Sequence, residues 1–357
     1  MDFDPNSAAM HDGLYGLPFD ADEAQFVVIP VPFDATTSYR DGTRNGPAAV
    51  LEASYQVDLF DIDFGRPWQS KIAMLALDKG GPREIAALNR EARKFAEPVI
   101  AVGGEIGGKP KLRKALDEVN RRSGRMCEIV EREARALIAK GKTPIVLGGD
   151  HSTPFGLIKA CGDAFPGLGI LHIDAHADLR VAFEGFEWSH ASIMHNVTSK
   201  IGGRGGIASL VQVGIRDFGE NEFDAINRAK GKSDTKITTY FDAGLQAAKF
   251  RGEEWAMLCD GMVSDLPAQV YVSVDIDGFD PKLCPDTGTP VPGGLEFNEF
   301  VELLRALLRA KKKIIGFDVN EVAPSRLTKP ADWGGDWNAN VGSRVLYKLI
   351  GAAAKSR

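Results

Sequence analysis

Short apolar runs that alternate with helical segments are the feature that most constrains the fold of this chain. The runs cover residues 26–31, 72–75, 145–147, 168–173, 210–213, 237–239, 270–274 and 314–318. They are nearly continuous, whereas strands with one face in water alternate apolar and polar residues. Nearly continuous apolar runs are typical of strands that are buried on both faces of a parallel sheet. We therefore expect one α/β domain with three layers, α-β-α, around a central, mainly parallel sheet.

Helical patterns fill the intervals between these runs. Gly46-Pro47 begins a pattern that continues to Val57, with proline near the first turn. Charge pairing and apolar spacing indicate further helices over residues 85–96, 111–139, 296–310 and 340–354. Residues 1–24 are polar and rich in turn formers. We divide the chain into an N-terminal extension, 1–24, and one domain, 25–357.

The composition excludes several classes of protein. The 43 Lys and Arg against 49 Asp and Glu give a net charge of −6, which offers no basic surface for nucleic acid. No apolar run reaches the ~20 residues that cross a bilayer, and the N-terminus lacks a signal peptide pattern. The cysteines are scattered without a C-x-x-C pair, which indicates free thiols in a reducing compartment. We expect a cytoplasmic protein that binds neither nucleic acid nor membrane.

Histidines and aspartates follow three of the predicted strands. The runs are Gly148–Ser152, Asp174–Asp178 and Ser273–Asp277. In an extended segment, side chains two positions apart point the same way, and ligands of open α/β sheets bind at the carboxyl ends of strands. The oxygen and nitrogen donors suit two divalent cations, manganese first, with nickel, cobalt or iron as alternatives. The candidate metal ligands are His151, Asp174, His176, Asp178, Asp275 and Asp277.

These motifs resemble the metal signatures of the ureohydrolases, the arginase and agmatinase family. Gly148–Ser152, Asp174–Asp178 and Ser273–Pro281 carry the resemblance, and Thr287–Pro290 and Asp318–Val322 match further family segments. Pro32–Asp34 and Gly46–Ala49 extend it toward the N-terminus, so that it covers residues 25–355 in order. It implies an arginase-like fold and a binuclear hydrolase that cleaves a guanidino group to urea and an amine by attack of a metal-bridging hydroxide.

The resemblance also implies a role for each site residue. One metal would be held by His151, Asp174, Asp178 and Asp275, and the other by His176, Asp174, Asp275 and Asp277. Asp178 would in addition orient the hydroxide. Glu321 would grip the planar guanidinium through two oxygens. His190 would shuttle protons near the entrance, a task suited to a pKa near neutrality.

Other polar residues receive more ordinary interpretations. His172 lies inside an apolar strand, and we expect a core residue or a group that orients a ligand. His195 falls on a predicted helix and is expected to be structural. Asp150 and Asp280 are expected to orient ligands or backbone. Cys284 is expected to pack, because no base lies beside it in sequence.

One further motif is a false lead. Residues 103–109 fit the G-x-x-x-x-G-K pattern of a phosphate-binding loop. Such a loop needs Ser or Thr next, and Pro110 occupies that position and removes a backbone donor. A turn that leads into a helix explains the glycines better.

The loop after Asp178 bears on the identity of the substrate. Glu184 and Glu187 would repel a substrate carboxylate, while Phe183, Phe186 and Trp188 offer apolar walls. Arginine is therefore disfavoured, and agmatine, a dication that would yield putrescine and urea, fits better. Arg180 argues the other way unless it pairs with an acidic residue.

Alternatives remain open at this point. The extension 1–24 resembles the leader of family members that hydrolyse free guanidine, small substituted guanidines or biguanides, some with nickel, and it could cap the pocket. Guanidinobutyrase, arginase and a deacetylase-like amidohydrolase with one zinc are weaker candidates, as is a non-catalytic subunit of a hetero-oligomer. The family implies a homo-oligomer, trimer or hexamer.

Overall fold

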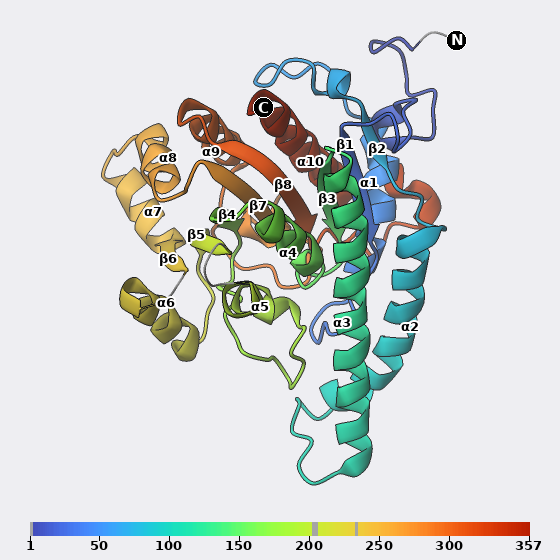
Figure 1. The fold of residues 1–357 in the computed structure, drawn as a ribbon, viewed down its shortest axis with the longest axis vertical. Helices are drawn as coiled ribbons and strands as arrows, with labels where there is room; N and C mark the ends of the chain where they lie inside the picture. Colours follow the sequence, from blue (N-terminus) through green and yellow to red (C-terminus); the bar gives the residue numbers. More distant parts are fainter. Residues whose placement is uncertain (1–2, 202–205, 233–234) are drawn as a thin grey trace.

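A single parallel sheet forms the middle of the molecule (Figure 1). The computed structural model describes residues 3–201, 206–232 and 235–357. All strand pairs of the sheet are parallel, in the order β2-β1-β3-β8-β7-β4-β5-β6. The strands are β1 (Phe26–Val31), β2 (Ile72–Met74), β3 (Thr143–Gly148), β4 (Leu168–Ile173), β5 (Ile207–Ile215), β6 (Lys236–Phe241), β7 (Gln269–Asp275) and β8 (Lys313–Asn320). The expected parallel sheet is confirmed.

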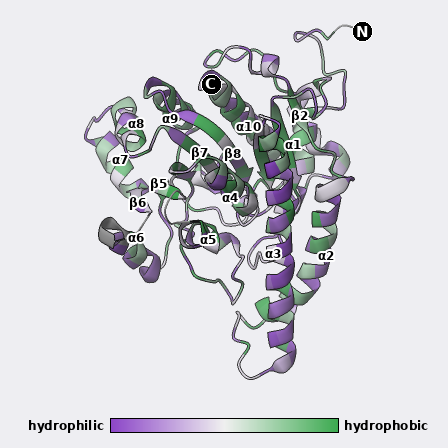
Figure 2. Ribbon diagram, in the orientation of Figure 1, coloured by the Kyte–Doolittle hydropathy of each residue, from purple (hydrophilic) through white to green (hydrophobic). Residues whose placement is uncertain are grey.

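Helices cover both faces of the sheet and complete the predicted three layers. One face carries α1 (Gly46–Ser54), α7 (Asp242–Phe250), α8 (Trp255–Ser264), α9 (Phe297–Arg309) and α10 (Trp337–Lys355). The other face carries α2 (Gly80–Ile100), α3 (Pro110–Ala139), α4 (Phe155–Ala164), α5 (Ile193–Lys200) and α6 (Glu220–Lys232). The strands appear mostly hydrophobic in Figure 2, whereas the exposed face of α3 is hydrophilic.

Alternate side chains of each strand enter different cores. In β1, Phe26 and Val28 belong to the core that includes residues of α10, and Val27 and Ile29 belong to the core on the side of α2 and α3. All four are fully buried. Burial of such a side chain contributes about 1.5–3 kcal/mol before the loss of chain entropy is subtracted. This double burial is the physical reason for the unbroken apolar runs.

Helix ends depend on local capping that the apolar pattern does not reveal. Asp336 accepts a hydrogen bond from the backbone N–H of Ala339 at 3.0 Å and begins α10 earlier than the predicted start at residue 340. Glu296 and Glu299 form a capping box at the start of α9.

In the described part of the chain, no helix combines the length and the apolar character that a membrane crossing needs.

The N-terminal extension packs against the amino edge of the sheet. The backbone N–H of Tyr15 donates to Ser54 Oγ at the end of α1, and its hydroxyl donates to the carbonyl of Ser343 in α10. The candidate ligands lie at the opposite, carboxyl edge. None of the described residues 3–24 lines the cavity at the candidate site, and the predicted cap stays a prediction; residues 1 and 2 lie outside the described residues.

Helices α2 and α3 form a long antiparallel hairpin that extends past the sheet (Figure 1). Its glycine-rich turn, residues 101–109, contains the false phosphate-binding motif. Gly103, Gly104 and Gly107 have positive φ, so the turn uses glycine for its conformation. Pro110 begins α3 at the position where a proline is tolerated, as expected for a turn that leads into a helix.

Candidate metal centre

The candidate site lies at the carboxyl ends of four adjacent strands. His151 follows β3, the Asp174–Asp178 run follows β4, Asp275 ends β7, and Glu321 follows β8. These strands are neighbours in the order β3-β8-β7-β4. The backbone N–H of His151 donates to Glu321 Oε1 at 3.0 Å across 170 positions of sequence. The parallel topology thus gathers distant motifs at one place.

The His151 imidazole faces three carboxylates with one ring nitrogen. Ser273 Oγ donates to Asp318 and accepts from His151 Nε2 at 3.0 Å, so Nε2 carries the proton. His151 Nδ1 then turns its lone pair toward carboxylate oxygens of Asp174, Asp178 and Asp275, at 2.9, 3.2 and 3.4 Å. A lone pair that faces three acceptors requires a cation, either a proton or a metal ion, between them.

His176 repeats this arrangement at the other side of Asp174. Its Nδ1 lies 3.1 Å from Asp277 Oδ2 and 3.5 Å from Asp174 Oδ1. The Asp277 carboxylate is held in place by the backbone N–H of Ala175 at 3.1 Å and the Thr289 hydroxyl at 3.2 Å. Asp174 belongs to both groups of potential ligands. The structure brings all six predicted ligands together, and their role as ligands stays a prediction.

The electrostatics of this cluster fit a pair of divalent cations. Burial, together with the neighbouring carboxylates, raises the pKa of Asp178 to about 7 and that of Asp275 well above its ordinary value. Burial disfavours the charged form of His176, but Asp277 and Asp174 outweigh it and raise its pKa to about 12. Without metal, the site must therefore hold protons to offset its negative charge. Oxygen and imidazole donors without sulfur suit manganese, nickel or cobalt.

Two of the site residues have a strained backbone. Asp178 and Glu321 have φ of 54° and 61°, a region that residues other than glycine rarely adopt. The Asp178 carbonyl accepts the N–H groups of Met194 and His195 at 3.0 Å each. The N–H of Glu321 donates to the carbonyl of Gly149 at 2.8 Å. Such strain, held by surrounding hydrogen bonds, is typical of functional positions.

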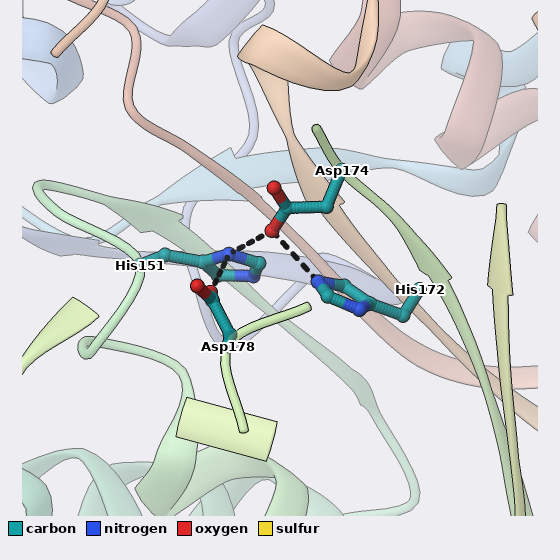
Figure 3. A group of neighbouring side chains, drawn as sticks. All are labelled: His151, His172, Asp174 and Asp178. Atoms are coloured by element: carbon teal, nitrogen blue, oxygen red, sulfur yellow. Dashed lines mark hydrogen bonds and ion pairs between the residues drawn. The ribbon is translucent and has the colours of Figure 1, made fainter. Parts of the chain in front are cut away.

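A chain of hydrogen bonds that begins at Thr239 fixes the position of the Asp174 carboxylate. Thr239 Oγ1 donates to Gln212 Oε1 at 2.9 Å, and Gln212 Nε2 donates to the Ala177 carbonyl and to His172 Nδ1. His172 Nε2 therefore carries the proton and donates to Asp174 Oδ2 at 2.8 Å (Figure 3). His172 lies in the same group of potential ligands as His151, but its Nδ1 accepts a hydrogen bond and its Nε2 carries the proton, so it presents no lone pair to a cation and orients Asp174. This was one of the two predicted roles.

A cavity of about 200 Å³ opens onto the cluster. His176, Asp178 and Glu321 lie on its inner side, and His190 lies on its wall. Burial and the neighbouring imidazoles lower the pKa of His190 to about 4, below the near-neutral pKa that suits the predicted proton shuttle, and the role of His190 stays a prediction. His190 is thus a neutral imidazole at neutral pH. No described group hydrogen-bonds its Nδ1, or Glu321 Oε2, which leaves both atoms available to a ligand.

The loop before α5 contributes less to the cavity than expected. Only Phe183 of its three aromatic residues lines the cavity; Phe186 is buried between α2 and α3, and Trp188 packs on Phe155. The carboxylates of Glu184 and Glu187 lie outside the lining as well. Phe186 and Trp188 therefore do not form the expected apolar walls of this cavity, and Phe183 does.

Arg180 forms a salt bridge, as the sequence allowed, but its partner is Glu222 and not an acidic residue of its own loop. Its Nε lies 3.3 Å from Glu222 Oε2, and Glu222 is buried. The other Glu222 oxygen accepts the N–H of Leu179 at 3.0 Å. Arg180 is neutralised and no longer argues for a substrate carboxylate.

Sequence reasoning missed several residues of the cavity. They are Thr37, Ser38, Tyr39, Arg40, Asp217, Glu222, Gly288 and Thr289. Residues 37–40 lie inside the N-terminal segment that carries part of the family resemblance, which was a signal for them. Asp217 pairs backbone to backbone with His176 beyond the end of β5, a contact that only the sheet register reveals.

The remaining polar candidates lie around the cluster. Asp150 is fully buried and caps its own turn through the N–H of Ser152 at 3.0 Å. Asp280 caps the turn after β7 through the N–H of Lys282, and it does not touch the ligands. Cys284 is buried, and burial raises the pKa of its thiol, as expected for packing. His195 lies in α5, as predicted.

Comparisons with known proteins agree with this geometry. The family model of the arginase family matches residues 24–351. The chain is 31% identical to an N(1)-aminopropylagmatine ureohydrolase of Thermus thermophilus, over 92% of this chain and 90% of that one. It is 27% identical to an agmatinase of Pyrococcus horikoshii, over 94% of each chain.

Solved structures show the same fold. The agmatine ureohydrolase of Thermoplasma volcanium superposes with a TM-score of 0.67 at 23% identity, over 98% of this chain and 95% of that one. A family match over most of the chain, with its metal motifs assembled at one edge of an all-parallel sheet, identifies the protein as a hydrolase. The chain belongs to the arginase family.

Proposed function

We propose that this protein hydrolyses an amine-bearing guanidino compound of the agmatine type to urea and an amine. The observation that carries the proposal is the pair of imidazole Nδ1 atoms that face buried carboxylates on either side of Asp174. Two divalent cations, when bound there, supply an activated water at neutral pH. His151, Asp174, Asp178 and Asp275 would hold one cation, and His176, Asp174, Asp275 and Asp277 the other.

The residues around the ions bind and orient the guanidino group. Glu321 lines the cavity; its Oε1 is fixed by the N–H of His151, while Oε2 has no hydrogen-bond partner among the described residues. A Cβ at Gly288 would lie 3.0 Å from Oε2, so glycine keeps the approach to this carboxylate open. A carboxylate held in this way matches the planar donors of a guanidinium. His190 lines the same cavity and is the proposed proton shuttle at the leaving nitrogen; its lowered pKa makes it a weak base whose protonated form donates readily to that nitrogen.

The charges of the cavity favour a cationic substrate tail. Asp217 lies at the rim with its side chain 67% exposed, and its Oδ2 is 3.9 Å from His176 Nε2. Arg180 is neutralised by Glu222, and Arg40 donates to the carbonyl of Pro285 and lies over the Tyr39 ring. The relatives named above act on agmatine or on N(1)-aminopropylagmatine. Free guanidine, the second candidate, is not favoured by them.

Several finer properties belong to the same proposal. Manganese is the proposed metal, with nickel as alternative, and a homo-oligomer is the proposed assembly. A cytoplasmic location is supported by four buried cysteines, none of which forms a disulfide among the described residues.

A urea-release assay tests the proposal. Metal-free protein is loaded with manganese or with nickel and offered agmatine, N(1)-aminopropylagmatine, guanidinobutyrate, arginine and guanidine. We expect the highest kcat/KM for an amine-bearing substrate. If guanidine alone is turned over, the proposed substrate is wrong. If no compound releases urea with either metal, the proposed function is wrong.

Glu321→Gln tests the binding of the guanidinium. Loss of a charge-assisted bidentate contact costs about 1.5–3 kcal/mol, so we expect KM to rise about 10- to 100-fold. Metal content, measured by mass spectrometry of the metals after desalting, should stay at two ions per chain. An unchanged KM would exclude Glu321 from substrate binding.

A further inference from the structure

The glycine-rich turn between α2 and α3 contacts the loop that forms one wall of the cavity. Gly104, in this turn, has φ of 77° and lies directly against Glu184. A Cβ added to Gly104 would lie 2.6 Å from Glu184 Cα and 2.8 Å from its carbonyl oxygen. Contacts this close are sterically forbidden, so the two backbones touch only because residue 104 is glycine.

The contacted loop is a tight turn with a defined geometry. Phe183 and Phe186 exchange two backbone hydrogen bonds, at 3.2 and 2.9 Å. The residues between them, Glu184 and Gly185, both have positive φ, 53° and 84°, which is the pattern of a type I′ turn. Glutamate is unfavourable at such a position. External contacts must therefore help to hold this turn, which we call the wall turn, residues 183–186.

Helix α3 supplies most of these external contacts. Asn120 Oδ1 accepts the N–H of Glu187 at 2.9 Å, and its amide donates to the Gly185 carbonyl at 3.3 Å. The Phe186 side chain is fully buried in the small core between α2 and α3, which includes Val99, Ile106 and Leu116. The hairpin tip and the wall turn thus share hydrogen bonds, an apolar core and a backbone contact.

The other side of the wall turn faces the cavity. Phe183 lines it, with its ring 6.0 Å from that of His190 and 5.2 Å below the Arg180 guanidinium. Glu184 lies close enough to Ser38, which also lines the cavity, for the Ser38 hydroxyl to affect the Glu184 pKa. A displacement of Glu184 would therefore move Phe183, its neighbour in the wall turn. The wall turn is the link between the hairpin tip and the space in which the substrate tail lies.

We propose that the α2–α3 turn is a positioning element that sets the width of the substrate-tail region through Gly104 and the wall turn. The proposal deepens the proposed function and rests on it. This contact explains one glycine of the false phosphate-binding motif, because Gly104 permits a close approach of its backbone to Glu184. Residues at the tip of a distant hairpin thereby act on specificity without touching the substrate.

Gly104→Ala, with Gly103→Ala as matched control, tests the proposal. Both glycines have positive φ, 77° and 59°, so alanine strains both backbones, but nothing lies within 4 Å of a Cβ at Gly103. In Gly104→Ala we expect KM for the preferred amine-bearing substrate to rise about fivefold or more. The value of kcat should stay within about twofold, and the metal content should not change. In Gly103→Ala, KM should stay within about twofold.

Hydrogen exchange of the wall turn gives a readout that does not depend on activity. The N–H groups of Phe186 and Glu187 should exchange faster in Gly104→Ala and in Asn120→Ala than in Gly103→Ala. Equal KM values and equal exchange in the two glycine variants would overturn the proposal. If the wild-type protein releases no urea, the function fails while the exchange comparison still decides the mechanical link.

Discussion

At the scale of single residues, the site is defined by which atom of each side chain faces inward. Ser273 and Gln212 each fix the tautomer of a histidine, so that His151 presents a lone pair to the cluster and His172 presents a proton. Two histidines a few ångströms apart therefore have opposite roles. Residue type alone could not distinguish them, because the distinction lies in their hydrogen-bond partners.

Asp275, like Asp174, is expected to bridge both ions, so its loss should affect both of them. Asp275→Asn removes one negative charge, and we expect the loaded protein to retain one ion per chain or fewer and to release no urea. Metal analysis after desalting and the urea assay check this. Asp280→Asn is the control, since Asp280 caps a turn of the same motif without touching the ligands. Two retained ions and normal turnover in Asp275→Asn would contradict the assignment.

Gln212 is expected to strengthen metal binding without contact to the ions. Gln212→Leu removes the donor to His172 Nδ1 and frees its tautomer, so Asp174 loses a fixed hydrogen bond. Changes of this kind cost about 10- to 100-fold in metal affinity. Titration calorimetry of the metal-free protein with manganese measures it. An affinity equal to that of the wild type would show that His172 needs no such support.

At the scale of elements, the sequence predicted the strands well and the loops poorly. An unbroken apolar run such as residues 168–173 reflects burial on both faces, a property of the strand itself, and it matches β4 residue for residue. The wall turn was interpreted as a substrate-binding loop because its aromatic and acidic residues are conspicuous. Phe186 instead enters the core of a hairpin formed some 70 to 90 positions earlier, by Val99 and Leu116. Contacts of this range have no local signal.

The start of α10 depends on one aspartate. Asp336 is buried; it accepts the N–H of Ala339 at 3.0 Å and the N–H of Ser325 at 2.8 Å. Asp336→Ala should lower the free energy of unfolding by about 1–2 kcal/mol, the usual contribution of such a cap. Urea denaturation measures this. Asp332→Ala, an exposed aspartate in the preceding turn, should change it by less than about 0.5 kcal/mol. Equal stability of the two variants would refute the cap.

At the scale of the whole molecule, distant segments are joined across the amino edge of the sheet. Asp63, between α1 and β2, contacts Arg305 of α9 and lies 2.6 Å from Lys348 of α10. Lys348 also lies 2.9 Å from Asp61. This cluster ties the first third of the chain to the last two helices, at the end of the molecule opposite the candidate metal centre.

The Asp63 cluster predicts a pH-dependent contribution to stability. Burial opposes ionisation of Asp63, but its bonds to Lys348 and Arg305 outweigh burial and lower its pKa below 3.8. A lowered pKa stabilises the fold above about pH 4, and the contribution is lost as the pH falls below that value. Asp63→Asn should therefore cost about 1 kcal/mol at pH 7 and close to nothing near pH 3.

Urea denaturation of the metal-free protein at both pH values measures this difference. Asp22→Asn is the control, because its partner Lys140 forms an exposed pair in which the Asp22 side chain is 84% accessible. No measurable change is expected there. A loss in Asp63→Asn that is equal at both pH values would show that the carboxylate acts through packing and not through its charge.

The order of the central strands also fixes the spacing of the residues at the candidate metal centre. Neighbouring strands in any sheet are about 4.8 Å apart, and two ions that share one water lie about 3.5–4 Å apart. Because β3, β8, β7 and β4 are adjacent, side chains at their carboxyl ends would be close enough to hold two such ions. The strands cannot change their spacing without breaking the hydrogen bonds between them. A difference in size between two kinds of metal ion bound there would then be absorbed by rotation of the aspartate and histidine side chains, while the strands keep their places.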